Sequence, residues 1–144
     1  MRLVLDTNVA LSGLLWLGVP GRLIEAAQAG RITIIATIPL LAELRGVIQR
    51  EKFVRQLRAR SVSIDDLLDG YIELVEMVPP ADLSAAVAGD PDDDTVLAAA
   101  LGGRADLIVS GDAHLLNMKH YQNIPIVPVV DAVKRVARDA PARS

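Results

Sequence analysis

The sequence contains no cysteine and very few aromatic residues. Without cysteine, the chain can form neither disulfide bonds nor thiolate zinc sites. Its 18 acidic residues outnumber its 15 lysines and arginines, so it lacks the overall basic charge of passive nucleic-acid-binding proteins, although a local basic patch stays compatible. No apolar run approaches the roughly 18 residues of a membrane span, and Asp6 interrupts any signal-peptide core. We therefore expect a cytoplasmic protein with no membrane segment.

The chain does have enough apolar material for a well-filled core. With 144 residues, of which 51% are hydrophobic, it falls in the size range of one domain. No linker, internal repeat or low-complexity stretch divides it. We predict a single domain over residues 1–140, followed by a frayed C-terminal tail at 141–144.

Short apolar runs alternate with helical patterns along the sequence. The runs of strand length lie at residues 3–5, 32–35, 75–78, 107–109 and 124–127. Helical patterns occupy residues 22–29, 64–68, 95–101 and 131–140, and a further helix starts near Pro39. This alternation favours an open α/β fold with a mostly parallel sheet, whose ligands bind beyond the carboxyl ends of the strands.

Acidic residues occur where a predicted strand ends or a predicted helix begins. They are Asp6, Glu43, the cluster at residues 90–94, and Asp112. Taken singly, an aspartate at a strand end is more often a turn or cap residue, and an acidic helix start is usually a solvated cap. Together, carboxylates that converge on one point repel each other unless a cation offsets their charge. The combined pattern therefore indicates a site for a hard metal ion.

Mg²⁺ and Mn²⁺ suit such a site because they prefer oxygen ligands and keep coordination positions open for water and substrate phosphate. A bound ion of this kind can polarise a phosphoryl oxygen, activate water and stabilise the leaving oxygen. The pattern thus favours phosphodiester chemistry that needs no serine or cysteine nucleophile.

Four segments, in this order and at this spacing, resemble a PIN-domain ribonuclease over nearly the whole chain. They are LVLDTNV at residues 3–9, LLAELR at 40–45, DPDDD at 90–94 and ADLIVSGD at 105–112. Within that superfamily, residues 6–16 resemble VapC-like toxins of toxin–antitoxin systems. The resemblance implies a three-layer α/β/α fold and a small endoribonuclease that depends on Mg²⁺ or Mn²⁺ and is restrained by a cognate antitoxin.

The resemblance also implies the site residues. Asp6, Glu43, Asp93 and Asp112 match the acidic quartet of the family. Within the acidic cluster the helix register selects Asp93, with Asp94 as its immediate competitor and Asp90 as an outer group. The polar residues implied to orient a carboxylate or a bound water are Asn8 and Ser110, with Thr7 either in the same role or capping the following helix. Asn8 is equally compatible with a plain turn amide.

Several other residues allow both a functional and a structural interpretation. His114 could touch substrate, but a solvated loop histidine is the more common case. Trp16 could stack on an RNA base, although such a residue more often packs in a core or subunit interface. A basic run is either a solvated helix face or a surface that holds RNA phosphates. Its members are Arg45, Arg50, Lys52, Arg55, Arg58 and Arg60.

Three functions follow from these features. The first is a metal-dependent endoribonuclease that acts on RNA as the toxin of a toxin–antitoxin pair, and the intact quartet favours it. The second is a non-catalytic PIN-fold module that docks a basic peptide or nucleic acid. The third is a metal-dependent phosphatase, which ranks last because Asn8 replaces the second aspartate of its usual motif. A homodimer is expected because residues 11–19 are more apolar than one helix face requires.

Overall fold

A computed structural model describes residues 1–15, 18–83, 87 and 89–139 of the chain. Its central sheet has the strand order β3-β2-β1-β4-β6-β5, and all neighbours are parallel except the antiparallel pair β5 and β6. The strands are β1 (Arg2–Leu5), β2 (Thr33–Ala36), β3 (Glu76–Met77), β4 (Leu107–Val109), β5 (His120–Tyr121) and β6 (Ile124–Val127). The predicted mostly parallel sheet is confirmed.

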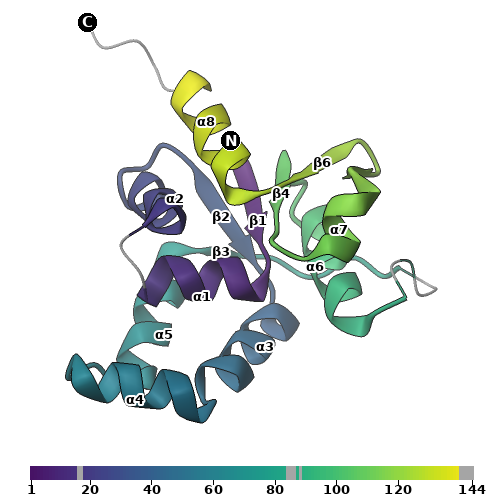
Figure 1. Cartoon of the computed structure of the whole chain (residues 1–144). Helices are drawn as coiled ribbons and strands as arrows, with labels where there is room; N and C mark the ends of the chain where they lie inside the picture. Colours follow the sequence, from purple (N-terminus) through teal and green to yellow (C-terminus); the bar gives the residue numbers. More distant parts are fainter. Residues whose placement is uncertain (16–17, 84–86, 88, 140–144) are drawn as a thin grey trace, which may run out of the picture.

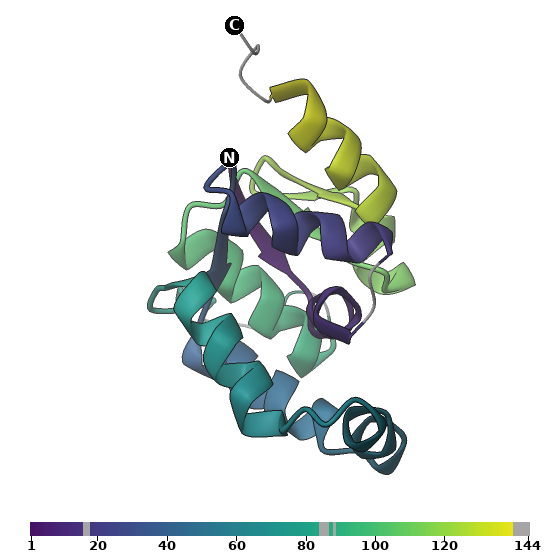
Figure 2. The same ribbon diagram turned by 90° about the vertical axis from the view of Figure 1, so that its left-hand side faces the viewer.

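Helices cover both faces of this sheet (Figures 1 and 2). They are α1 (Thr7–Leu15), α2 (Val19–Gln28), α3 (Ile38–Ile48), α4 (Glu51–Ala59), α5 (Ile64–Leu74), α6 (Pro91–Gly102), α7 (Ala113–Met118) and α8 (Val129–Asp139). Because successive side chains of a strand point to opposite faces, Leu3 and Leu5 pack with α1, α2 and α8, whereas Val4 packs with α6 and α7. The three-layer α/β/α prediction is therefore confirmed.

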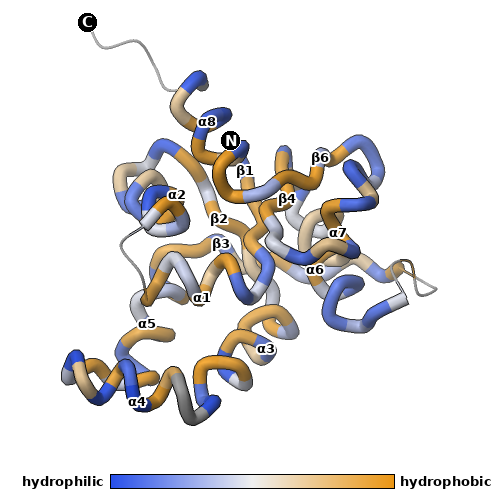
Figure 3. Tube along the Cα trace, in the orientation of Figure 1, coloured by the Kyte–Doolittle hydropathy of each residue, from blue (hydrophilic) through white to orange (hydrophobic). Residues whose placement is uncertain are grey.

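The buried strands run through the centre of the molecule as apolar segments (Figure 3). In the central strands β1, β2 and β4, every residue except the first of β1 and the first of β2 is buried, as expected for a parallel sheet that is covered on both faces. The short edge strand β5 was not predicted, since two residues carry no periodic signal.

Local sequence signals explain most helix starts. Thr37 caps α3 by accepting a hydrogen bond from the Leu40 amide at 3.2 Å, and Ser63 caps α5 in the same way through the Asp66 amide at 3.0 Å. The predicted helix at 22–29 begins earlier, at Val19, and the predicted C-terminal helix begins at Val129 rather than at residue 131. Both helices begin two or three residues before the polar residue at which the sequence pattern placed their start. The predicted tail at 141–144 lies outside the described residues.

Helices α3, α4 and α5 form a lobe beyond the carboxyl end of the sheet (Figures 1 and 2). Leu44 and Ile48 of α3, and Leu68 and Tyr71 of α5, join the core shared with α1 and α2. The Arg60 guanidinium donates a hydrogen bond to the Leu15 carbonyl and so fixes the end of α4 to α1. This packing places one side of α3 opposite the end of β1.

No single helix in the described part of the chain is long and apolar enough to cross a membrane. Among the helices that the structure describes, one bent pair, α1 and α2 at 84°, reaches the required length and hydropathy when taken together, and buried core helices of a folded domain also do so.

Candidate functional site

The centre of the sheet brings the ends of β1 and β4 together. From β1 the chain continues to β2 on one side, whereas β4 lies on the other side, so the strand order reverses between β1 and β4. In open α/β sheets ligands bind beyond the carboxyl ends of the strands at such a reversal. Leu5 pairs with Val109 in the sheet register, so the next residues, Asp6 and Ser110, become neighbours.

Asp6 is held by three hydrogen bonds. Its Oδ1 accepts from the Val9 amide at 2.8 Å, which caps α1. Its Oδ2 accepts from the Ser110 hydroxyl and from the Gly111 amide, the latter at 3.2 Å. The Ser110 oxygen in turn accepts from the Asp112 amide at 3.0 Å. Buried Ser110 therefore connects the Asp6 carboxylate to the backbone of Asp112.

Two further carboxylates also start helices. Asp90 caps α6 by accepting from the Asp92 amide at 2.8 Å, and Asp112 caps α7 by accepting from the His114 amide at 3.0 Å. The helix dipoles favour negative charge at both positions. The carboxylates of Asp90 and Asp112 therefore cap helices and also line the candidate site.

The carboxylates line a cleft of about 330 Å³ between α1, α3, α6 and α7. The predicted residues found in its lining are Asp6, Thr7, Asn8, Glu43, Asp90, Asp93 and Asp112, which are joined there by Asp92, Val96 and Gly111. Asp94 lies outside the cleft, because both of its carboxylate oxygens accept from the Val87 amide at 3.2 Å. Asp6 caps α1, so the alternative capping role of Thr7 is not what the structure shows.

The carboxyl groups of Asp93 and Asp112 interact, and their pKa values shift in opposite directions. Burial raises the pKa of Asp93 to about 7, and its hydrogen bond with the Asp112 carboxyl adds to the shift. The same hydrogen bond lowers the pKa of Asp112, as does, to a smaller extent, the bond from the His114 amide. Asp93 therefore holds its proton to a higher pH than Asp112 does.

Glu43 enters the cleft from α3. Burial, followed by the negative charge of Asp92, raises its pKa, while the nearby Thr7 hydroxyl partly offsets that rise. The Thr7 Oγ1 and Glu43 Oε2 atoms are nevertheless buried and make no regular hydrogen bond within the described structure. Such buried polar atoms without partners are costly, and at a site they point to an absent ligand.

A hard divalent cation fits this donor set. Asp93 Oδ2 has no hydrogen-bond partner among the described residues, as with Glu43 Oε2, and the lining is rich in carboxylate oxygens. No three acidic or histidine side chains of the described residues already converge closely enough to hold a metal ion.

The other predicted residues are distributed around this cleft. Arg45 pairs with Asp65 of α5 at 3.3 Å, and both side chains are exposed. Arg50 and Arg55 are exposed at the start and middle of α4, whereas the side chain of Lys52 lies outside the described residues, as does Trp16. His114 is exposed in the first turn of α7, so the loop assignment was wrong. The position of Asp92 in the cleft lining was not predicted. Three successive aspartates in a sequence do not show which of their side chains point into the cleft.

The sequence matches the PIN domain over residues 2–114. The chain belongs to the PIN-domain family. A solved structure that resembles this PIN domain is described as VapBC2 from Rickettsia felis bound to a DNA fragment from their promoter. The similarity has a TM-score of 0.59 and covers 89% of this chain and 98% of that chain, at 16% sequence identity, so it shows a shared fold. No curated protein matches the sequence.

Proposed function

We propose that this PIN-domain protein is an endoribonuclease that depends on Mg²⁺ or Mn²⁺. The observation that carries the proposal is the cleft at the reversal of the strand order, where carboxylates gather around oxygen atoms that have no partner in the described structure. If these carboxylates had only a structural role, their buried oxygens would be expected to accept hydrogen bonds from protein donors.

The residues would divide the work as follows. Asp6 is fixed in place by Val9, Ser110 and Gly111, so it would serve as the rigid ligand. Asp93 and Glu43 would contribute their unpartnered oxygens, and Asp112 would complete the set. When bound, Mg²⁺ or Mn²⁺ supplies Lewis acidity toward a phosphodiester and activation of water.

The rim of the cleft supports contact with a polar strand. Asn8 is exposed in the first turn of α1, and its amide can orient water or phosphate near Asp6. Arg50 and Arg55 would hold phosphates farther along the RNA. Arg45 contributes less, since its guanidinium already pairs with Asp65.

The likeness to a chain of a VapBC complex supports a biological role as well as a fold. We infer that this protein is the toxin of a toxin–antitoxin pair, acts as a homodimer, and is restrained by a cognate antitoxin. Its excess of carboxylates in the cleft suits a basic inhibitory segment.

Replacement of Asp93 by asparagine tests the chemistry with little disturbance of the fold, because Asp93 Oδ2 accepts no hydrogen bond from the described residues. We expect Asp93→Asn to lower the rate of RNA cleavage in Mn²⁺ by at least about 100-fold while RNA affinity is kept or rises. The control is Asp69→Asn, which removes an exposed charge from α5. Equal cleavage by both variants would reject the site. RNA binding by wild type with no cleavage in either metal would favour the docking module instead, and metal-dependent release of phosphate from a monoester would favour the phosphatase.

A further inference from the structure

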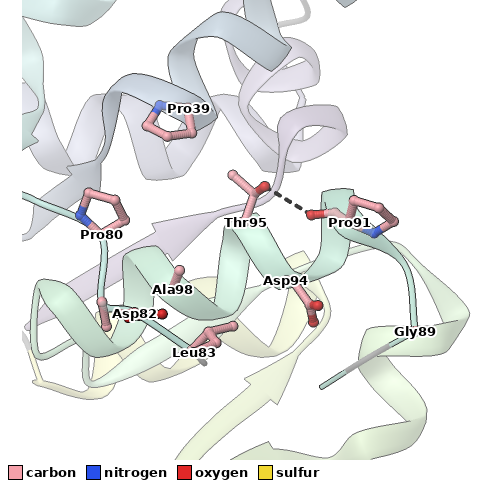
Figure 4. Close-up of a pocket in the computed structure, with 10 residues that line it drawn as sticks. Pro39, Pro80, Asp82, Leu83, Gly89, Pro91, Asp94, Thr95 and Ala98 are labelled. Atoms are coloured by element: carbon pink, nitrogen blue, oxygen red, sulfur yellow. Dashed lines mark hydrogen bonds between the residues drawn. The ribbon is translucent and has the colours of Figure 1, made fainter. Parts of the chain in front are cut away.

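A second, larger hollow lies beside the acidic cleft on another face of α6. Its volume is about 610 Å³, and Thr95 and Ala98 of α6 form its floor (Figure 4). Pro39 of α3 lines one side, and Pro80 and Leu83 line the other. We call this hollow the α6 groove.

The acidic cleft and the α6 groove share the first turns of one helix. Asp90, Asp92 and Asp93 line the cleft, whereas Pro91, Asp94 and Thr95 line the groove. An α-helix with its side chains is only about 10–12 Å across. A strand of nucleic acid whose backbone passes the cleft can therefore reach the groove with a neighbouring base.

The walls of the groove are fixed by the fold. The Ala81 amide donates to the Ala98 carbonyl at 2.9 Å, which attaches the wall at residues 79–83 to α6. The approach is so close that a Cβ atom on Gly102 would overlap the Pro79 carbonyl oxygen. Thr37 fixes the opposite wall by capping α3. The groove is thus formed before any ligand arrives, which lowers the entropy cost of binding.

The lining of the groove suits an uncharged flat ring and excludes phosphate. Prolines, alanines and a leucine supply its apolar surface, and none of its described lining residues is a lysine or arginine. Asp82 and Asp94 add negative charge, which repels a phosphate group. With aromatic residues at only 3% of the chain, apolar rings and aliphatic groups must replace the usual aromatic stacking platforms.

The polar side chains of the groove offer acceptors. The carboxylates of Asp82 and Asp94 are hydrogen-bond acceptors, and although Asp94 already accepts from the Val87 amide, a carboxylate has room for more than one donor. The Thr95 hydroxyl donates its proton to the Pro91 carbonyl at 2.9 Å, so its oxygen presents lone pairs to the groove (Figure 4). A ligand that brings hydrogen-bond donors therefore suits the groove.

We propose that the α6 groove is a subsite for a nucleobase that carries an exocyclic amino group: adenine, cytosine or guanine rather than uracil. Such a base presents an N–H₂ donor to the carboxylates, whereas uracil has two carbonyls and a single N–H. The proposal rests on the proposed ribonuclease function, and it assigns to the groove the choice of base next to the cleaved bond.

Binding of nucleosides tests the groove without any need for cleavage. Adenosine, cytidine, guanosine and uridine would each be titrated into isotope-labelled wild-type protein, and the amide chemical shifts of Ala81, Thr95 and Ala98 followed. We expect the three amino-bearing nucleosides to shift these amides, with uridine weaker by roughly 3- to 10-fold, the factor expected for one missing hydrogen bond. Ala98→Leu should fill the groove and abolish the shifts at Ala81 and Thr95. The matched control is Ala137→Leu on the exposed face of α8, which should leave them unchanged.

Cleavage of an RNA pool with random sequence gives the second readout. Wild type and Ala137→Leu should cut with a preference for amino-bearing bases at one position beside the cut, and Ala98→Leu should cut without that preference. No shift with any nucleoside, or equal shifts with uridine, would overturn the proposal, as would shifts caused only by a Leu-Arg peptide. Nucleoside binding by a protein that cuts no RNA would instead reject the proposed ribonuclease while the groove assignment stands.

Discussion

Replacement of Ser110 by alanine should weaken both the fold and the metal site. The Ser110 hydroxyl is fully buried, donates to Asp6 and accepts from the Asp112 amide. A hydrogen bond to a charged group contributes about 1.5–3 kcal/mol, and a buried donor left without a partner costs about 1–3 kcal/mol. Because Asp112 is partly exposed, water can replace part of the second loss. We therefore expect Ser110→Ala to lower the free energy of unfolding by about 2–4 kcal/mol.

Ser63→Ala is the matched control, since it removes the same hydroxyl from an exposed helix cap far from the cleft. Its expected cost is about 1 kcal/mol. Urea denaturation in EDTA would measure both losses, and calorimetric titration with Mn²⁺ would measure metal affinity. Ser110→Ala should bind Mn²⁺ roughly 10- to 100-fold more weakly, as expected when a group that orients a ligand is removed, whereas Ser63→Ala should bind it normally.

Equal stability losses in the two variants, together with unchanged Mn²⁺ affinity, would refute this reasoning. That result would mean that the amides of Val9 and Gly111 hold Asp6 without help from the hydroxyl.

Three further predictions concern the wall of the α6 groove, an exposed position on α3 and the protons of the cleft. Gly102→Ala should lower the free energy of unfolding by about 1–3 kcal/mol, because the new Cβ overlaps the Pro79 carbonyl. Urea denaturation would measure this loss, and an unchanged stability would show that the wall of the groove at Pro79 can move. Gly46→Ala, in open space on α3, should instead raise it by about 0.5–1 kcal/mol, and a loss there would point to an unseen constraint at that position. With EDTA present, the raised pKa of Asp93 means that the folded state holds its proton above pH 4, so stability should fall as pH rises from about 4 to about 7, and Asp93→Asn should flatten that slope. The lowered pKa of Asp112 has the opposite effect on stability, which is lost only as the pH falls below the ordinary range of an aspartate. If the slope of stability against pH were the same in Asp93→Asn as in wild type, the proton would belong to another group.

The strands and the positions of the carboxylates could be predicted because their signals are local. The runs at 3–5 and 107–109 are apolar on both faces, which marks buried parallel strands, and each is followed by polar residues that end it. Asp6 directly follows β1 in the structure, and Asp112 lies between β4 and α7, where it caps α7.

The contacts between these positions could not be predicted in the same way. The bond from Ser110 to Asp6 joins residues 104 positions apart and exists only because β1 and β4 pair in one register. The choice between Asp93 and Asp94 depends on a rotation of about 100° between successive helix residues, which packing of α6 fixes. The α6 groove has walls from three separate segments, so no stretch of sequence contains its signal.

The use of Asp6, Asp90 and Asp112 as helix caps has an evolutionary consequence. In many enzymes, loss of a catalytic acid relieves repulsion and stabilises the protein, so inactive descendants arise easily. In this protein the loss of one of these acids would also remove the N-terminal cap of α1, α6 or α7 and so destabilise that helix. For the proposed nuclease activity, the substitutions expected to remove it at the lowest cost to folding are therefore those of Asp93 and Glu43, each of which has one buried carboxylate oxygen without a hydrogen-bond partner among the described residues. Inactive relatives that keep this fold should therefore have changed those two positions first.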